Sequence, residues 1–365
     1  MQNGLTTRAS LLAAAAAAAL LAYAVPADAR PAVGRRIGGG PRSDVHSVSD
    51  PGRPGHGVVK VIRPGVWEGN RLRVRSARSR TQYVKASVQA TAKLAADKAF
   101  TARFGSIVAP EAESAADPTW LFRKMADGAP LSQLGADQQR TARREVRAAV
   151  KMARSIVGRG INPSAENFLF DASTGRITAW FSVLQQPKGP LVEGLVRTGE
   201  QPIGEGVNMV AYRATINGKP KIVKLMKFAS DQREPAIASE EDLVEVTDAL
   251  VTSTRTLRES PEIIRRFGAD VIPLTESPAP GVVIVDEVKG VPFSSLDAAA
   301  RERATNEVAE LVTIARRLLP QHIIAGTKDP RLVGKLNFFF HPDGRVAGWF
   351  DHISDSKRNY VNRSR

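Results

Sequence analysis

The sequence contains no cysteine, and aromatic residues make up only 6% of the chain. The missing thiols exclude disulfide bonds and lipid attachment at a cysteine. The formal net charge is +15, yet lysine and arginine are dispersed and form no long basic run. A nucleic-acid-binding surface normally shows a clearer basic stripe with aromatic residues, so the composition argues against DNA or RNA as the partner. It favours a protein partner, so far unknown, or another acidic surface.

Long apolar runs are missing after the N-terminus. Arg8 precedes an alanine-rich apolar stretch over residues 11–25, and residues 27–29 have the small-x-small pattern of a cleavage site. This arrangement predicts a secretory signal peptide over residues 1–29 and an exported protein, periplasmic or secreted. The apolar stretch is short for a membrane span, so we expect no transmembrane segment once the signal is cleaved.

Two parts of the chain resemble each other. Residues 102–110 match residues 265–273, and further matches follow in the same order at offsets of 162 to 170 residues. These later matches pair Gly128–Leu134 with Gly290–Leu296, Asn167–Phe170 with Asn337–Phe340, and Ala179–Ser182 with Gly348–Asp351. An ordered series of this kind predicts a tandem duplication.

The repeat gives a domain division. We place copy one at residues 58–185, a linker at 186–194, copy two at 195–355 and a basic tail at 356–365. Residues 30–57 are rich in Gly, Pro and Arg and taken alone indicate a flexible linker. However, residues 37–40 align with residues 203–206, so the alternative is a decayed glycine-loop hairpin of copy one. Each copy is small for an independent two-lobed fold, so we expect the copies to pack together.

The stretch from Leu336 to Asp351 has the pattern of an apolar strand, a tight turn at residues 342–344 and a second apolar strand. Because the strands of a hairpin lie side by side, Asn337 and Asp351 should meet at its open end. An amide oxygen beside a carboxylate is a typical ligand pair for Mg²⁺ held against phosphates. The alternative is an ordinary core hairpin with polar ends.

Copy two also contains a pattern that suits phosphate binding. Gly204 and Gly206 lie in a turn before a strand, and glycines allow the backbone to approach phosphates closely. Lys224 follows on the next strand between apolar neighbours and could pair with nucleotide phosphates, or could be an edge-strand lysine whose ammonium merely reaches solvent. The predicted helix over residues 237–257 then carries Glu241 and Glu245 one turn apart, and either could pair with Lys224.

This order of glycine turn, strand lysine, acidic helix, long helix and Asn–Asp hairpin resembles the protein-kinase-like fold, including small bacterial effector kinases and aminoglycoside phosphotransferases. The resemblance covers about 150 residues of each copy and implies an α+β fold. Each unit would have a small antiparallel sheet followed by a mainly helical lobe with a β-hairpin. The resemblance also implies ATP and Mg²⁺ as cofactors. The nucleotide would contact Gly204, Gly206, Lys224 and Glu241 or Glu245, and the metal would be held by Asn337 and Asp351.

The sequence departs from the pattern of that family at the catalytic aspartate. Leu332 occupies the expected position, five residues before Asn337. Asp329 lies three residues further upstream, and we predict that it orients the acceptor while Lys224 holds the transferred phosphate. In copy one, Asn162 and Ser182 replace the catalytic and the metal-binding aspartates. Neither can supply a carboxylate, so copy one is predicted to be a degenerate, pseudokinase-like unit.

Three functions fit these patterns. The first is an exported, ATP- and Mg²⁺-dependent phosphotransferase acting through copy two. The second is a catalytically inactive tandem pseudokinase that serves as a protein-binding scaffold or regulator, because the catalytic Asp is missing from both copies. The third is a basic, surface-binding secreted protein that uses no nucleotide.

Overall fold

The structure is a computed structural model that describes residues 32–40, 42–49, 57–109, 111–113, 117–158, 160–205, 209–227, 240–320 and 337–349. The predicted signal peptide, the basic tail and three candidate site residues (Gly206, Asp329 and Asp351) lie outside these ranges. The described elements form a mixed α+β protein with antiparallel sheets, as the sequence predicted. No described helix combines the length and the hydrophobicity that a membrane crossing requires.

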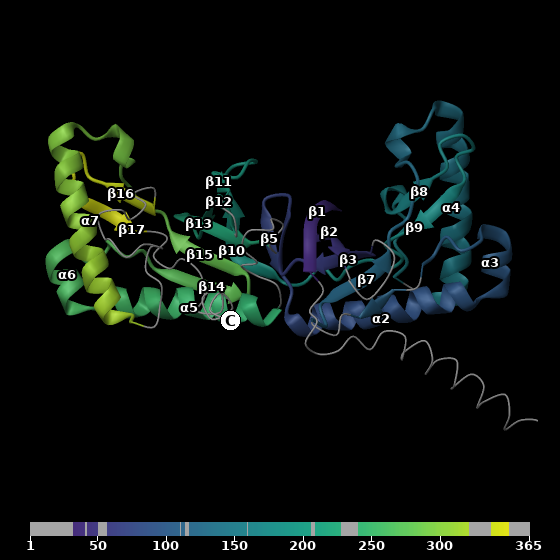
Figure 1. Ribbon diagram of the computed structural model, residues 1–365, viewed down its shortest axis with the longest axis horizontal. Coiled ribbons are helices and arrows are strands. Elements are labelled where there is room, and N and C mark those ends of the chain that lie inside the picture. Colours follow the sequence, from purple (N-terminus) through teal and green to yellow (C-terminus); the bar gives the residue numbers. More distant parts are fainter. Residues whose placement is uncertain are drawn as a thin grey trace, which may run out of the picture. The chain divides into compact units, whose positions relative to one another are not determined.

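The chain divides into two compact units, whose elements are labelled in Figure 1. Unit 1 consists of residues 1–38, 45–62 and 81–186, and unit 2 consists of residues 39–44, 63–80 and 187–365. The chain therefore passes from one unit to the other several times, and the division does not follow a single cut between the two predicted copies.

Unit 1 is built on a five-stranded sheet with the order β1-β2-β3-β7-β6. Its strands are β1 (Ala32–Gly40), β2 (Ser43–Ser49), β3 (Gly57–Ile62), β6 (Ala112–Glu113) and β7 (Trp120–Lys124). Two of them, β1 and β2, come from the segment rich in Gly, Pro and Arg. Helix α2 (Ala77–Ala96), which begins in unit 2, packs Tyr83 and Val84 against Ile62 and Leu121 of this sheet.

The remainder of unit 1 is mainly helical. It contains α3 (Lys98–Phe104), η1 (Leu131–Gln133), α4 (Ala136–Val157), η2 (Ala165–Asn167) and a hairpin of β8 (Phe168–Phe170) and β9 (Ile177–Trp180). Helix α4 is strongly amphipathic, and its buried face packs with Phe168, Phe170 and Trp180 of the hairpin in one apolar core.

Unit 2 has a longer sheet with the order β14-β15-β13-β12-β10-β5-β4, and β11 pairs with β12 beside this path. The strands are β4 (Gly65–Glu68), β5 (Arg71–Val74), β10 (Leu191–Arg197), β11 (Gly204–Glu205), β12 (Met209–Ile216), β13 (Lys219–Met226), β14 (Thr275–Ala279) and β15 (Val282–Asp286). Strand β10 begins inside the predicted linker. Asn217 and Gly218 form the turn between β12 and β13, and both have positive φ angles, as an Asn-Gly hairpin turn requires.

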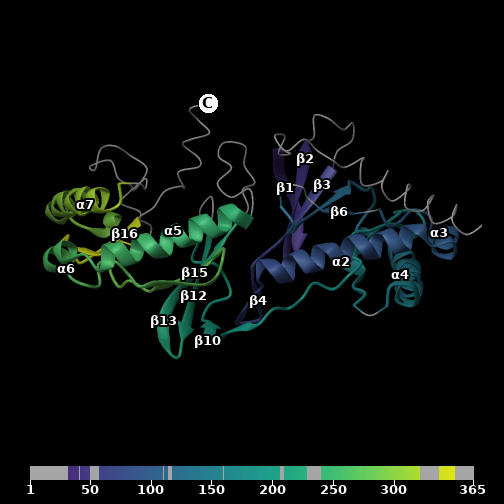
Figure 2. The ribbon, with the colours of Figure 1, turned by 90° about the horizontal axis from the view of Figure 1, so that it is seen from below.

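The helical part of unit 2 follows the sheet. It contains α5 (Glu240–Arg258), α6 (Pro261–Phe267), η3 (Phe293–Ser295), α7 (Ala298–Leu318) and a hairpin of β16 (Phe338–Phe340) and β17 (Val346–Trp349). Helix α5 runs along one face of the sheet (Figure 2), where the Thr247 hydroxyl accepts a hydrogen bond of 2.9 Å from the backbone N–H of Gly281. Helix α7 packs against the hairpin in the largest apolar core of this unit.

Strands β4 and β5 precede copy one's long helix in the sequence, but they complete the sheet of unit 2. Strand β5 pairs antiparallel with β10, and its Leu72 is fully buried with Leu195 and Val223. The first turn of α2 also belongs to unit 2. There the fully buried Arg80 donates to Glu240 at a distance of 2.5 Å. Residues 63–80 are therefore part of the structural core of the second unit.

The two units share one order of elements from their first long helix onward. In both units a long helix, a short helix, two strands, a 3₁₀ turn, a second long helix and a β-hairpin follow one another. The buried stripes of α2 and α5 also coincide at a constant offset of 163 residues: Arg80, Val84, Ser87 and Leu94 correspond to Leu243, Thr247, Leu250 and Leu257. The predicted repeat thus has a counterpart in the elements, while the duplication event itself stays a prediction.

We expect that Leu72→Ala destabilises the protein by about 2–5 kcal/mol, because the substitution leaves a cavity in the sheet core of unit 2. The matched control is Leu191→Ala on β10, whose side chain is 40% exposed. That change should cost less than about 1 kcal/mol. Urea denaturation followed by circular dichroism measures both effects, and equal losses for the two variants would contradict this role of β5.

Candidate functional site

The two β-hairpins have the same register and the same aromatic packing. Phe168 pairs with Trp180 in unit 1, and Phe338 pairs with Trp349 in unit 2. The paired rings stack with centroids 4.7 Å apart in the first hairpin and 5.0 Å apart in the second. The stacked pair is buried in each unit, so it fixes the position of the open end of the hairpin, which in unit 2 includes Asn337.

A glycine holds the turn of each hairpin against the second long helix. Gly175 has a φ angle of +72° and Gly344 a φ angle of +87°, which favour glycine. A Cβ atom at either position would also collide with backbone atoms in the first turn of the helix, at Gln138 in α4 and at Ala300 in α7. The glycine-containing turns that the sequence indicated are therefore required for close packing as well as for the turn itself.

The open end of the unit 1 hairpin meets the strand lysine of that unit. The backbone N–H of Phe181 donates to the carbonyl of Asn167 at 2.9 Å, so the Asn end and the Ser182 end lie side by side. The ammonium of Lys60 on β3 donates to the Ser182 hydroxyl at 3.0 Å, and both side chains are buried. Unit 1 thus brings together the three positions that correspond to Lys224, Asn337 and Asp351.

Lys224 occupies an interior position in unit 2. It lies on β13 between Ala211 of β12 and Val283 of β15, and only 9% of its surface is exposed. Lys60 has the equivalent register, because it is paired with Leu121 of β7. Strand β13 is paired on both sides, so Lys224 is not an edge-strand lysine whose ammonium merely reaches solvent.

Gly204, predicted in a turn, lies in the short strand β11. Gly204 pairs with Ala211 in the short ladder of β11 and β12, and an added Cβ at Gly204 would meet open space. Gly206 lies just outside the described residues. The next residue of β11, Glu205, forms an ion pair of 2.8 Å with Lys227.

The acidic residues near the start of helix α5 differ in exposure. Glu241 is exposed and Glu245 is half-buried, whereas Asp242 is 7% exposed on the buried stripe of the helix. In unit 1 the Lys60 ammonium lies over the ring of Tyr83, 5.9 Å from the ring centroid. Position 246 of α5 corresponds to Tyr83. Asp242 lies one turn before position 246 on this face. In the sequence, the helical period of the apolar residues in this segment would have pointed to Asp242 as a residue of this face.

Asn337 is half-buried immediately before β16. Asp351 and Asp329 lie outside the described residues, and no group of three or more His, Cys, Asp or Glu side chains in the described part could hold a metal ion. An amide and one carboxylate are nevertheless a ligand set that suits Mg²⁺ when substrate phosphates supply further oxygens.

In unit 1, Asn162 occupies the position at which the resemblance implies a catalytic aspartate, and it forms hydrogen bonds with the backbone. The side-chain oxygen of Asn162 accepts from the backbone N–H of Ser164 at 3.2 Å, and the backbone N–H of Asn162 donates to the carbonyl of Val183 at 2.8 Å. Asn162 therefore closes a local turn next to the hairpin and offers no base.

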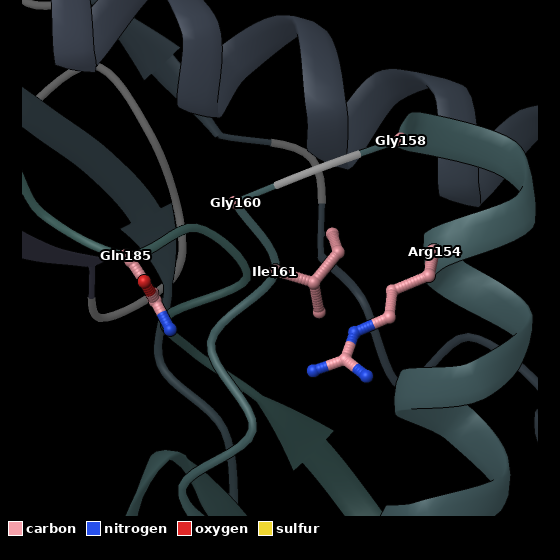
Figure 3. Close-up of a pocket in the computed structure, with 5 residues that line it drawn as sticks. All are labelled: Arg154, Gly158, Gly160, Ile161 and Gln185. Carbon is pink, nitrogen blue, oxygen red and sulfur yellow. The ribbon is translucent and has the colours of Figure 1, made fainter.

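A pocket of about 360 Å³ opens close to this turn, lined by Arg154, Gly158, Gly160, Ile161 and Gln185. The guanidinium of Arg154, at the C-terminal end of α4, points into it (Figure 3). Lys60 and Ser182 are not among its lining residues, so the pocket is separate from the lysine–hairpin contact.

Comparison with known proteins gives no family. No family description matches the sequence, and no curated protein matches it. Solved structures match parts of the chain. The structure of Rv3197 with erythromycin from Mycobacterium tuberculosis is 18% identical with a TM-score of 0.30, over 46% of this chain and 49% of that one. The crystal structure of Cex1p is 14% identical with a TM-score of 0.26, over 45% of this chain and 30% of that one. The match therefore spans half or less of each of these structures.

The hairpin turn of unit 1 contains a titratable group with a shifted pKa. Hydrogen bonds from the Ser173 hydroxyl and from the Thr174 hydroxyl and backbone N–H lower the pKa of Asp171 from 3.8 to about 2. Because the folded pKa is the lower one, this carboxylate stabilises the fold above pH 3.8, and its contribution is lost as the pH falls through about 2.

We expect a carboxyl-carbon NMR titration of the whole protein to give Asp171 a pKa of about 2. Replacing Ser173 and Thr174 together by alanine removes both hydroxyl donors, so the Asp171 pKa should rise toward 3.8. An Asp171 pKa that is already at 3.8 in the unmodified protein would contradict the hydrogen bonds at this turn.

Proposed function

We propose that the protein is an exported phosphotransferase of kinase-like architecture that uses ATP and Mg²⁺ in unit 2. The observation that carries the proposal is the 3.0 Å contact between Lys60 and Ser182 in unit 1. If the equivalent positions of unit 2 meet in the same way, the ammonium of Lys224 would lie beside the carboxylate of Asp351. A buried lysine, an amide and a carboxylate converging at one hairpin end suit a phosphate chain with its bound cation.

In this proposal each residue of unit 2 has a separate role. The turn of Gly204 and Gly206 covers the phosphates, and Lys224 neutralises part of their charge. Asn337 and Asp351 would hold Mg²⁺, which stabilises the charge that develops on the transferred group. Asp329 orients the acceptor hydroxyl, and an acidic residue of α5 (Asp242, Glu241 or Glu245) positions Lys224. The acceptor would be a protein or an acidic surface.

A specific observation favours the second function, a scaffold, for unit 1. Ser182 and Asn162 there carry no charge, and the first accepts from Lys60 while the second closes a backbone turn. We propose that unit 1 is non-catalytic and has a binding or regulatory role. Export of the chain would place it where ATP is scarce, so the phosphotransferase would act after delivery into another cell.

Millimolar Mg-ATP should raise the melting temperature of the whole protein, because a ligand that binds only the folded state stabilises it by mass action. Lys224→Met and Asp351→Asn should each remove the shift and reduce phosphate transfer by about 10²–10³-fold. Differential scanning calorimetry and labelled ATP measure the two effects.

The matched control is Lys60→Met in unit 1, which should leave the phosphate transfer in place, because unit 1 is proposed to be non-catalytic. No shift at millimolar Mg-ATP would overturn the enzyme and leave the scaffold. A shift that survives Asp351→Asn but disappears with Lys60→Met would move nucleotide binding to the wrong unit and also overturn the proposal.

A further inference from the structure

The centre of unit 1 contains two buried cations on the same face of one sheet. Lys60 of β3 pairs with Leu121 of β7, and Arg123 follows two residues later on the same side of that strand. Lys60 is 5% exposed and Arg123 is 9% exposed. Both reach the end of the hairpin, where Lys60 donates to Ser182 and the guanidinium of Arg123 lies 5.6 Å from the ring centroid of Phe181.

These two cations are poorly compensated. No carboxylate among the described residues forms an ion pair with Lys60 or with Arg123, and the Arg123 guanidinium has no hydrogen-bond acceptor in the described part of the chain. Burial lowers the pKa of Arg123, and the charge of Glu111 opposes this effect. Glu111 is itself buried, and one of its oxygens accepts from the Ser87 hydroxyl at 2.6 Å. Glu111 therefore acts on Arg123 through its charge, without an ion pair or hydrogen bond between them.

A buried cation without a counter-charge is costly, since its hydration is lost and no ion pair replaces it. In the sequence of unit 2, Val285 takes the position that corresponds to Arg123, and Asp351 takes the position of Ser182. At both of these positions unit 1 therefore carries more positive charge than unit 2. In unit 1 both positions lie where Lys60 meets the end of the hairpin.

We propose that this centre of unit 1 is a binding site for a phosphate-type oxyanion, held by Lys60, Arg123 and Ser182 without a metal ion. Lysine and arginine supply charged donors to the oxygens, and the Ser182 hydroxyl, which accepts from Lys60, still has its own proton to donate. Ser182 offers no carboxylate that would repel the anion or recruit a divalent cation. The site does not depend on catalysis in unit 2.

The test is calorimetric melting of the whole protein in EDTA, with inorganic phosphate compared with sodium chloride at equal ionic strength. Phosphate at several times its dissociation constant should raise the melting temperature of unit 1 by roughly 2–4 °C. Lys60→Met and Arg123→Leu should each abolish the shift. Arg123→Leu should in addition melt no lower than the unmodified protein in phosphate-free buffer, because it removes a buried unpaired cation.

Two control variants distinguish a specific effect from the general loss of one positive charge, and an effect in unit 1 from an effect in unit 2. Arg143→Leu removes an exposed arginine of unit 1, and Lys219→Met removes an exposed lysine from the sheet of unit 2. Both variants should keep the full phosphate shift. In a second set of measurements O-phosphoserine replaces phosphate. This comparison distinguishes binding of the free anion from binding of a phosphoryl group that is carried on a larger molecule.

The absence of a phosphate-specific shift would overturn the proposal. So would a shift of equal size in all four variants, which would indicate a general salt effect. If Arg123→Leu failed to fold by circular dichroism, Lys60→Met would decide between a site and no site.

Discussion

The contact between a hairpin-turn glycine and the first turn of the second long helix constrains the position of everything near the candidate sites. Gly344 against Ala300 in unit 2, and Gly175 against Gln138 in unit 1, allow the hairpin to approach the helix backbone directly. The stacked Phe–Trp pair then fixes the direction of the two strands. The hairpin end can meet a lysine on the sheet only because both contacts hold it there, as it does at Lys60 and Ser182.

The features that depend on local pattern were predictable from the sequence. The hairpin with its glycine turn, the Asn-Gly turn at Asn217 and the helix predicted over residues 237–257 follow from periodicity and turn chemistry. The α+β class was implied by the resemblance to the kinase-like fold. The ordered matches between the two halves predicted a shared order of elements, which the structure has. Lys224 was expected on a strand after the glycine turn, and it lies there, buried.

The features that depend on distant partners were not predictable. Nothing local in residues 65–74 indicates that β5 pairs with β10, since strand pairing is chosen by the whole sheet. Arg80 is one of many arginines in the sequence, and its burial against Glu240 becomes visible only when α2 and α5 are placed. The burial of Asp242 likewise depends on the packing of α5.

The β5–β10 pairing also has a consequence for the order of folding. Its partners are more than a hundred residues apart, and the whole of unit 1's helical part is synthesised between them. Strands β4 and β5 therefore emerge early but must wait for the second half of the chain before their edge is covered. Long-range pairing of this kind is slow, because the intervening chain must be closed into a loop first. Until then the unpaired edge of β5 is open to intermolecular strand exchange, so this hairpin adds a long-range step to the folding of unit 2.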